Sequence, residues 1–498
     1  MHAYSRLESQ FRRYFNLKHL ESIAQWDGAV MMPEGGGSAR GEALAELEFT
    51  MNEILKHPAI ADDMTAAEGH SATLDDWQKA NLREMKRLWQ QSISVSPELA
   101  RRKTIAGAKC ELAWRKYRFE NNWKEFLPLF EHVVTAAREE DDERAAFFKT
   151  SPYNSLLDRY EPGLTTDRLD PLFADLRAFL TDLLPQVMEK QKKEKTTEFN
   201  RTFPTDRQRE LCMNTVKALG FDFKHGRVDV STHPFCGGTQ GDLRITPRYL
   251  EKNFLDSFTS VIHETGHASY EQGLAKRWKG QPVGLARSLG MHESQSLLFE
   301  MQMALSKEFI GFMAPEMRKA LGDPGDSEEV WHADNLYRLC TRVQPSYIRV
   351  MADEVTYPLH VILRFEIERD LISKKIEARH LPEVWDEKMK SYLGLSTKDN
   401  YKDGCMQDIH WTDGTFGYFP TYSLGAMNAA QIFTSACRNN PSIKANLKTG
   451  DFSLLKNWLD EKIWSTGSLY SVDQLMTNAT GEALNTKYFK EHLKNRYL

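Results

Sequence analysis

The stretch that most constrains this chain is His263-Glu264-Thr265-Gly266-His267, just past the middle of its 498 residues. Ahead of it, apolar residues recur at helical spacing: Phe254, Leu255, Phe258, Val261 and Ile262. On a helix, two histidines four residues apart share one face, so both imidazoles can reach a single metal ion. Glu264 would then face a water on that ion. The stretch is the His-Glu-x-x-His pattern of zinc hydrolases, which supplies two ligands and a general base.

A glycine inside this predicted helix needs a physical reason. Gly266 costs about 1 kcal/mol relative to alanine in a helix interior. We therefore predict that another element of the fold packs closely against the helix at this position.

A catalytic zinc site needs a third protein ligand and one open position for water. We favour Glu293, which begins a second predicted helix whose apolar residues are Leu297, Leu298, Met301, Leu305 and Ile310. The residues in between suffice for a return loop over 279–284 and an antiparallel neighbour. His292 is the alternative third ligand. Glu293 would then not bind the metal itself but would support a ligand. Glu293 is preferred because two histidines and one glutamate form a known ligand set of zinc hydrolases.

The clear strand signal precedes the metal-binding stretch. Residues 228–233 and 242–246 alternate in polarity around the glycine-rich residues 236–241, so we predict a hairpin. Period two places Asp242 and Arg244 on one face. Two interpretations stay open. The hairpin is a wall that pairs with an extended peptide, or it is structural and these two residues form an ion pair.

The rest of the chain is typical of a mainly α-helical protein. We predict helices over 4–24, 39–55, 72–148 (three helices), 167–197, 328–339, 347–375, 382–393 and, with breaks, 424–498. Non-helical segments are expected over 26–37, 151–163 and 400–422, where Gly, Pro, Asp or aromatic residues cluster.

Charge and cysteine usage exclude several classes of protein. The net charge of −5 argues against nucleic acid or an anionic membrane as the main partner. No apolar run reaches the roughly 18 residues that span a membrane. The charged start of the chain lacks the apolar core of a signal peptide. The six cysteines show no paired spacing, as is typical of free thiols in a reducing compartment, so we expect a cytoplasmic protein.

Six motifs in order resemble those of the thermostable (Taq-type) zinc metallocarboxypeptidase family. They are His233-Pro234-Phe235, Asp242-Leu243-Arg244-Ile245-Thr246, His263-Glu264-Thr265-Gly266-His267, His292-Glu293-Ser294-Gln295, Arg349-Val350-Met351-Ala352-Asp353 and Gly404-Cys405-Met406-Gln407-Asp408-Ile409-His410-Trp411. With shorter matches near both ends, the resemblance spans nearly the whole chain. One departure is Trp464, at a position where many relatives have histidine.

The resemblance implies a fold and an activity. The fold would be one large helical peptidase domain over 1–498 with a small β-sheet beside the active-site cleft. Residues 1–150 would form a helical part that covers the cleft, and 200–425 the catalytic core with the metal site. The activity would be that of a zinc carboxypeptidase of broad specificity, in which Co²⁺ can replace Zn²⁺. It would act on peptides with a free C-terminus, as a homodimer.

An exopeptidase must hold the free carboxylate of its substrate. The guanidinium fork of arginine does this with two parallel hydrogen bonds. The resemblance makes Arg349 the first choice and Arg244 the second. It also places Arg244, with Asp242 and Gln407, at the far end of the groove, where these residues would limit it to chain ends.

Further substrate-binding residues follow from the same resemblance. His410, Tyr418 and Tyr422 lie in the aromatic segment 400–422 and are unranked candidates to donate to the developing oxyanion. His233 and His292 complete the predicted set.

Two other functions are considered. One is an oligopeptidase or dipeptidyl carboxypeptidase on a similar helical scaffold. The other is a peptide-binding scaffold that retains structural zinc. Glu264 argues against the second, because a structural zinc normally has four protein ligands and no use for a general base.

Overall fold

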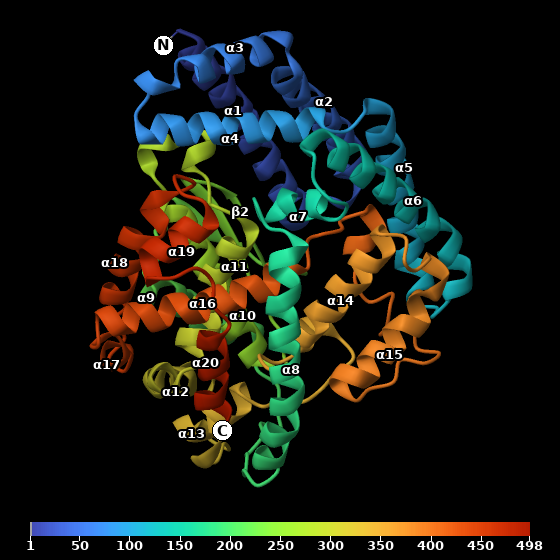
Figure 1. Cartoon of the computed structure of the whole chain (residues 1–498). Coiled ribbons are helices and arrows are strands. Elements are labelled where there is room, and N and C mark those ends of the chain that lie inside the picture. Colours follow the sequence, from blue (N-terminus) through green and yellow to red (C-terminus); the bar gives the residue numbers. More distant parts are fainter. Residues whose placement is uncertain (1) are drawn as a thin grey trace.

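The computed structural model describes residues 2–498 and is mainly α-helical, with one small sheet in the described part of the chain (Figure 1). This confirms the predicted fold class. Two large apolar cores and two smaller clusters organise the described helices, and the two large cores flank the cavity described below. No helix within residues 2–498 is both long and apolar enough to cross a membrane.

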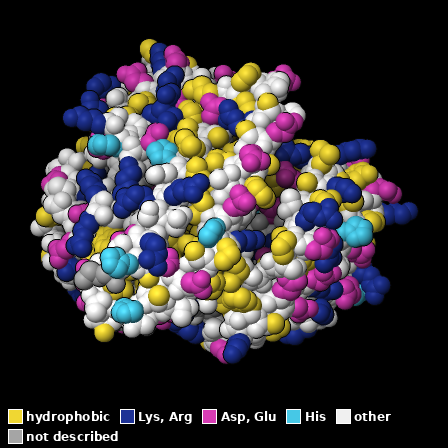
Figure 2. All heavy atoms as spheres, turned by 90° about the horizontal axis from the view of Figure 1, so that it is seen from above, with side chains coloured by type: hydrophobic (Ala, Val, Ile, Leu, Met, Phe, Trp, Pro, Cys, Tyr) yellow, Lys and Arg dark blue, Asp and Glu magenta, His cyan; other side chains and the backbone are white. Residues whose placement is uncertain are grey.

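The N-terminal helices form a layer at the top of Figure 1. They are α1 (His2–Val30), α2 (Gly37–Lys56), α3 (Pro58–Gly69) and α4 (Asp76–Ile93). The predicted loop over 26–37 is wrong at its start, because α1 continues to Val30. A contact from outside the helix stabilises this last part of α1, because the guanidinium of Arg244 lies 4.4 Å from the buried ring of Trp26. Acidic and basic side chains are interspersed on the face seen in Figure 2.

A second group of helices surrounds the largest core. It consists of α5 (Pro97–Tyr117), α6 (Trp123–Phe148), α7 (Asn154–Tyr160), α8 (Thr166–Gln191), α14 (Tyr357–Ile372) and α15 (Leu381–Leu393). The expectation of a non-helical passage over 151–163 is wrong, because α7 occupies its centre. Two prolines flank α7 without interrupting it, and the buried carboxylate of Asp141 accepts a hydrogen bond from the Tyr153 amide at its start.

The remaining elements pack around the other large core. They are α9 (Thr205–Ala218), α10 (Phe254–Gly273), α11 (Leu289–Leu297), α12 (Lys307–Leu321), α13 (Ala333–Cys340), α16 (Pro420–Asn439), α17 (Ile443–Leu447), α18 (Ser453–Lys462), α19 (Val472–Thr480) and α20 (Lys487–Tyr497). The exception is α20, whose buried apolar residues all belong to the largest core, and α16 contributes to both cores.

The helix predicted from residue 347 is wrong in its first ten residues or so, since α14 begins only at Tyr357. The preceding segment holds a single 3-10 turn, Arg349–Met351. The carboxylate of Asp353 accepts hydrogen bonds from the amides of Val355 and Thr356, which keeps this segment in a turn instead of a helix.

The sheet has three short strands in the order β1-β3-β2: β1 (Gly226–Val228), β2 (Phe235–Thr239) and β3 (Asp242–Thr246). The strand predicted over 242–246 is confirmed, and its hairpin partner is β2 instead of residues 228–233. Residues of the expected connection pair with β3, because Gly238 and Gly241 adopt positive φ and allow a tight turn. The β1 strand, in contrast, pairs with β3 in parallel.

The helix predicted from Glu293 through Ile310 is not continuous. It consists of α11, a π-helical segment over Leu298–Ala304, and α12, which Ser306 caps. Glu293 therefore lies in the middle of α11 and not at a helix start.

Close packing at Gly266 is confirmed. A Cβ added there would lie 2.6 Å from the Gln295 carbonyl oxygen and 2.7 Å from the Ser296 Cα. The two helices that carry the predicted metal ligands therefore touch backbone to backbone at this point.

The contact at Gly266 predicts the effect of adding one methyl group. Gly266→Ala should lower the free energy of unfolding by about 1–3 kcal/mol, because the neighbouring backbone has to move. Urea unfolding measures the change. Gly311→Ala is the matched control, since Gly311 lies inside α12 with nothing within 4 Å of the added Cβ. It should leave the protein equally stable or more stable by up to about 1 kcal/mol. Equal midpoints for both variants would contradict the role given to this contact.

Candidate metal centre

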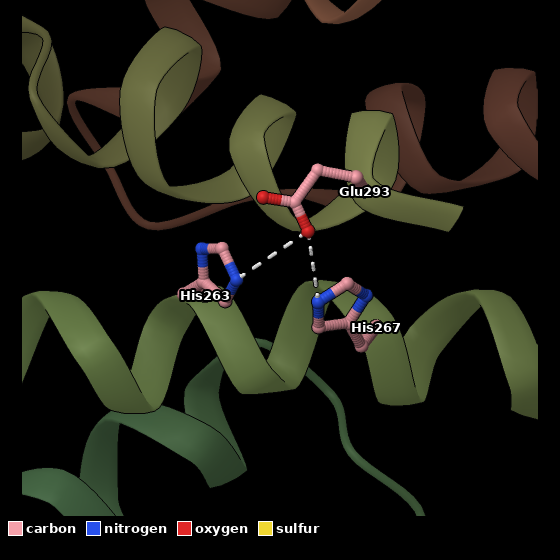
Figure 3. A group of neighbouring side chains, drawn as sticks. All are labelled: His263, His267 and Glu293. Atoms are coloured by element: carbon pink, nitrogen blue, oxygen red, sulfur yellow. Dashed lines mark ion pairs between the residues drawn. The ribbon is translucent and has the colours of Figure 1, made fainter. Parts of the chain in front are cut away.

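Three side chains converge between α10 and α11 (Figure 3). His263 and His267 project from the same face of α10, and the carboxylate of Glu293 on α11 points toward them. One Glu293 oxygen lies 3.9 Å from His263 Nε2 and 3.4 Å from His267 Nε2. All three ligand atoms lie within 4.8 Å of one another.

These residues fit a divalent metal. Zinc binds imidazole nitrogen and carboxylate oxygen at about 2.0–2.2 Å, so ligand atoms around one ion lie about 3–4 Å apart. The Glu293 oxygen meets this spacing with both Nε2 atoms. The set leaves room for a non-protein ligand, as a catalytic site requires.

The local charges also favour a cation. Burial would lower the pKa of His263, but the hydrogen bond with Glu300 and the charges of Glu293, Glu300 and Glu264 raise it to about 10. Burial lowers the pKa of His267 to about 4. Burial would raise the pKa of Glu293, but its hydrogen bond with His267 and the nearby imidazoles lower it to about 2. The cluster therefore has an excess of carboxylate charge that a divalent ion would neutralise.

Glu300 is a site residue that the sequence analysis missed. Its Oε2 lies 2.7 Å from His263 Nδ1, which directs the other ring nitrogen toward Glu293. Glu300 lies on the π-helical segment, two turns beyond Glu293. In the sequence, a glutamate two helical turns after Glu293 falls on the same side of the predicted helix. This spacing is the signal by which Glu300 could be identified.

Glu264 lines the same cavity and is largely buried. Burial raises its pKa to about 7, with a further contribution of the same sign from the charge of Glu293, while His263 opposes the shift. A carboxylate with this pKa can exchange a proton at neutral pH.

His292 lies beside the cluster without belonging to it. Its ring stacks on that of His267 at a centroid distance of 4.5 Å, and its Nε2 lies 3.0 Å from Glu271. Within residues 2–498, the group of side chains that can hold a metal contains Glu293 and not His292.

The cluster opens into a cavity of about 610 Å³ between the two larger cores. Pro234, Phe235 and Cys236, at the start of β2, form part of one wall. The sheet thus lies beside the cleft, as predicted. Arg349, Tyr418 and other residues that follow α13 in sequence also line the cavity.

Arg349 is held rigidly at the cavity wall. Its Nε donates to Asp408 at 3.0 Å and its Nη1 to the Tyr357 hydroxyl at 2.8 Å. Asp408 also accepts from Arg364 at 2.6 Å, and all three charged side chains are at least nine-tenths buried. Burial would lower the pKa of Arg349, but the nearby oxygen atoms raise it, so the guanidinium stays charged.

The aromatic segment contributes Tyr418 and Tyr422 to the cavity wall. His410 lies behind them, with Nε2 3.4 Å from the Tyr422 hydroxyl and its ring 4.6 Å from that of Phe419. Burial lowers the pKa of His410 to about 4, so its imidazole is neutral at neutral pH.

Besides His410, four predicted substrate-binding residues do not line this cavity: His233, Asp242, Arg244 and Gln407. His233 is exposed. Asp242 and Arg244 form an ion pair at 2.7 Å, which agrees with the structural interpretation of the hairpin. Gln407 accepts from the Arg349 amide at 2.8 Å and donates to the Tyr347 carbonyl, so it holds the turn that carries Arg349.

The unusual Trp464 has a defined contact next to the site. Its indole Nε1 donates to Gln295 Oε1 at 2.9 Å, and its ring covers Gly273 at the end of α10. The tryptophan thus links α11 to α10.

The buried pairing of Asp408 predicts a large loss of stability. Asp408→Asn would leave two buried guanidinium groups without their counter-ion, at a cost of about 3–5 kcal/mol at neutral pH. Burial would raise the pKa of Asp408, but both arginines hold it far below its usual range. Its contribution is therefore present above about pH 4 and is lost as the pH falls, so the two proteins should converge in acid.

Urea unfolding at several pH values checks this expectation. Asp473→Asn is the control, because its ion pair with Arg168 is half exposed and should contribute less than about 1 kcal/mol. Similar losses for both variants would contradict the prediction.

Known proteins are similar to this chain over its whole length. The family described as carboxypeptidase Taq (M32) metallopeptidase matches residues 6–497. Thermostable carboxypeptidase 1 of Thermus thermophilus is 34% identical over 99% of this chain and 98% of its own. Carboxypeptidase 1 of Bacillus subtilis is 32% identical over 98% of this chain and 96% of its own.

A solved structure agrees with these matches. Trypanosoma cruzi metallocarboxypeptidase 1 is 44% identical and superposes with a TM-score of 0.97, covering 100% of this chain and 99% of that one. These relatives carry the name carboxypeptidase, so the oligopeptidase alternative is not favoured. The chain is therefore a metallocarboxypeptidase that belongs to the carboxypeptidase Taq (M32) metallopeptidase family.

Proposed function

We propose that this metallocarboxypeptidase uses zinc, with His263, His267 and Glu293 as ligands and Glu264 as general base. Membership of a metallopeptidase family implies a divalent metal. The observation that carries the proposal is the convergence of the three ligand atoms at the wall of one cavity. Two imidazole nitrogens and one carboxylate oxygen suit zinc, and cobalt can accept the same donors.

Each side chain of the cavity then has a proposed role in peptide hydrolysis. When bound, the metal would polarise the scissile carbonyl and make a water molecule more acidic. Glu264 would take the proton from this water and pass it to the departing amine. Tyr418 and Tyr422 are the proposed donors to the developing oxyanion, and His410 supports them from behind.

The preference for chain ends is assigned to Arg349. We propose that its guanidinium binds the free carboxylate of the substrate, supported by its place at the cavity wall and its fixed orientation. Asp242 and Arg244 lie on β3, directly behind the strand that lines the cavity, and are proposed to limit the far end of the cleft. His233, His292 and Gln407 remain proposed contributors to substrate binding, Gln407 through the turn of Arg349.

Wider properties are proposed from the same reasoning. The six cysteines are unpaired, which supports a reducing compartment such as the cytoplasm. The substrates are proposed to be peptides of broad sequence. A homodimer is proposed on family resemblance, and light scattering on the purified protein would reject it by giving the mass of one chain.

Residues 1–150 are proposed to cover the cleft. The Ser22 hydroxyl donates to the Gly238 carbonyl at 2.9 Å, so α1 reaches the strand that lines the cavity. Unchanged hydrogen exchange in α1 when a peptide inhibitor binds would argue against this cover.

The reaction itself is tested by digesting a decapeptide and following the products by mass spectrometry. Removal of single C-terminal residues, lost with a chelator and regained with Zn²⁺ or Co²⁺, is the expected result. Release of dipeptides, or trimming that survives complete metal removal, would reject the proposal.

Glu264→Gln should abolish turnover without removing the metal. The amide cannot accept the proton of the attacking water, so kcat should fall at least about a thousandfold. Metal analysis should give the wild-type zinc content, because Glu264 is not a proposed ligand. A variant with substantial activity would refute the assignment of the general base.

Arg349→Ala should damage cleavage of free C-termini most. The loss of a bidentate, buried contact should reduce kcat/KM about 100-fold on free peptides and much less on C-terminally amidated ones. Arg244→Ala is made in parallel, since Arg244 is the other candidate for the carboxylate. Equal losses on both kinds of peptide would reject the role of Arg349, and a selective loss in Arg244→Ala would transfer it.

A further inference from the structure

A buried carboxylate outside the metal cluster is bound to the helix that carries Glu293. Glu161, directly after α7, is only 4% exposed. Its Oε1 accepts a hydrogen bond from the Ser288 hydroxyl at 2.8 Å, and its Oε2 accepts one from the Gly290 amide at 3.0 Å. Both donors lie at the start of α11, so Glu161 reaches across the fold to that helix end.

The start of α11 is arranged to bind this carboxyl group, whose pKa burial raises to about 7 while the hydrogen bonds from Ser288 and Gly290 oppose the shift. Its own first turn contains no acidic residue. The first amides of a helix have no acceptor within the helix, and they lie at the positive end of its dipole. In α11 another segment supplies the acceptor, because the Gly290 amide donates to Glu161. Ser288 is the N-cap, because its hydroxyl accepts from the Met291 amide at 3.0 Å while it donates to Glu161.

Gly290 makes the close approach possible. A Cβ at this position would lie 2.7 Å from Glu161 Oε2 and 3.3 Å from its Cδ. Any larger residue would push the carboxylate away from the helix end.

A second buried carboxylate holds the preceding residue. Arg287 is 5% exposed, and its Nη1 and Nη2 donate to the two oxygens of Glu84 at 2.8 and 3.0 Å. Glu84 lies on α4 in the N-terminal layer. Two distant segments thus fix consecutive residues at the entry to α11.

The position of Glu293 depends on this anchored end. It lies one turn beyond Gly290 on a helix of nine residues that passes into the π-helical segment at Leu298. So short a helix has little stability of its own, and its axis is set by the contacts at its ends and sides. A shift of the first turn would move the Glu293 carboxylate relative to the two histidines on α10.

We propose that Glu161 is a positioning residue of the metal site, which holds the first turn of α11 so that Glu293 meets His263 and His267. This inference rests on the proposed metal ligands. It assigns Glu161 no contact with the metal or the substrate, so its removal should affect metal affinity before anything else.

The test compares zinc affinity in Glu161→Gln and the wild type by competition with a chromophoric chelator. The amide oxygen can accept from Ser288 or Gly290 but not from both, and the amide nitrogen then faces a donor. We expect zinc to bind at least about tenfold more weakly, as when other supports of metal ligands are removed. Excess zinc should restore much of kcat, with KM for the peptide little changed.

Glu368→Gln is the matched control. Glu368 is also a fully buried carboxylate, and it accepts hydrogen bonds from Trp411 Nε1, the Tyr153 hydroxyl and the Gly417 amide. None of these donors lies on α10 or α11. Its loss should lower thermal stability without a comparable change in zinc affinity.

Gly290→Ala gives an independent reading if Glu161→Gln folds poorly. This variant keeps the Glu161 carboxylate but displaces it from the helix end, so zinc should again bind more weakly than in the wild type. Zinc affinities within twofold of wild type in both Glu161→Gln and Gly290→Ala, or an equal loss in Glu368→Gln, would overturn the inference. A wild-type protein that binds no zinc would instead refute the proposed function.

Discussion

The backbone contact between α10 and α11 is the constraint on which the candidate metal centre depends. Gly266 has no side chain, so the two helices meet at Gln295 and Ser296 closely enough for Glu293 to approach both histidines. A second glycine supports the same helix from the other side, since a Cβ at Gly425 on α16 would lie 2.6 Å from Glu293 Cγ. Small residues thus set the spacing of the ligand atoms, because protein interiors are close-packed and transmit displacements.

Buried and partly buried carboxylates form a second layer of support around the cavity. Glu300 orients His263, Asp408 holds Arg349, and Glu161 holds the start of α11. Each connects segments that are distant in sequence, and each is hydrogen-bonded to donors on the segment that it holds. Removing one partner of such a pair costs stability, because the other partner is left buried without a hydrogen bond. These pairs are therefore effective at keeping short helices and turns, which have little intrinsic stability, in one place.

Local patterns predicted some of this architecture and failed elsewhere for identifiable reasons. The apolar stripe before His263 indicated α10 because a helix that packs against a core repeats every 3.6 residues. The alternation over 228–233 suggested a strand, yet the glycine-rich β2 pairs with β3, since two glycines with positive φ allow the turn. Residues 151–163 contain a helix whose start is held from another part of the chain, since Asp141 on α6 accepts a hydrogen bond from the Tyr153 amide. Glu300 belongs to no ligand motif, and its role in orienting His263 is defined only by the contact that the fold creates.

The amino-acid sequence by itself indicated the helical fold class, the pair of histidines on one helix face and Glu293 as the carboxylate that converges with them. These depend on side-chain periodicity and on ligand chemistry, which are local properties of the chain. Only the tertiary structure decided that Arg349 lines the cavity while Asp242, Arg244 and Gln407 stand behind its walls. It also decided which buried carboxylates hold which helices. Those partners are far apart along the chain, and an ion pair leaves no periodic signal that would reveal them.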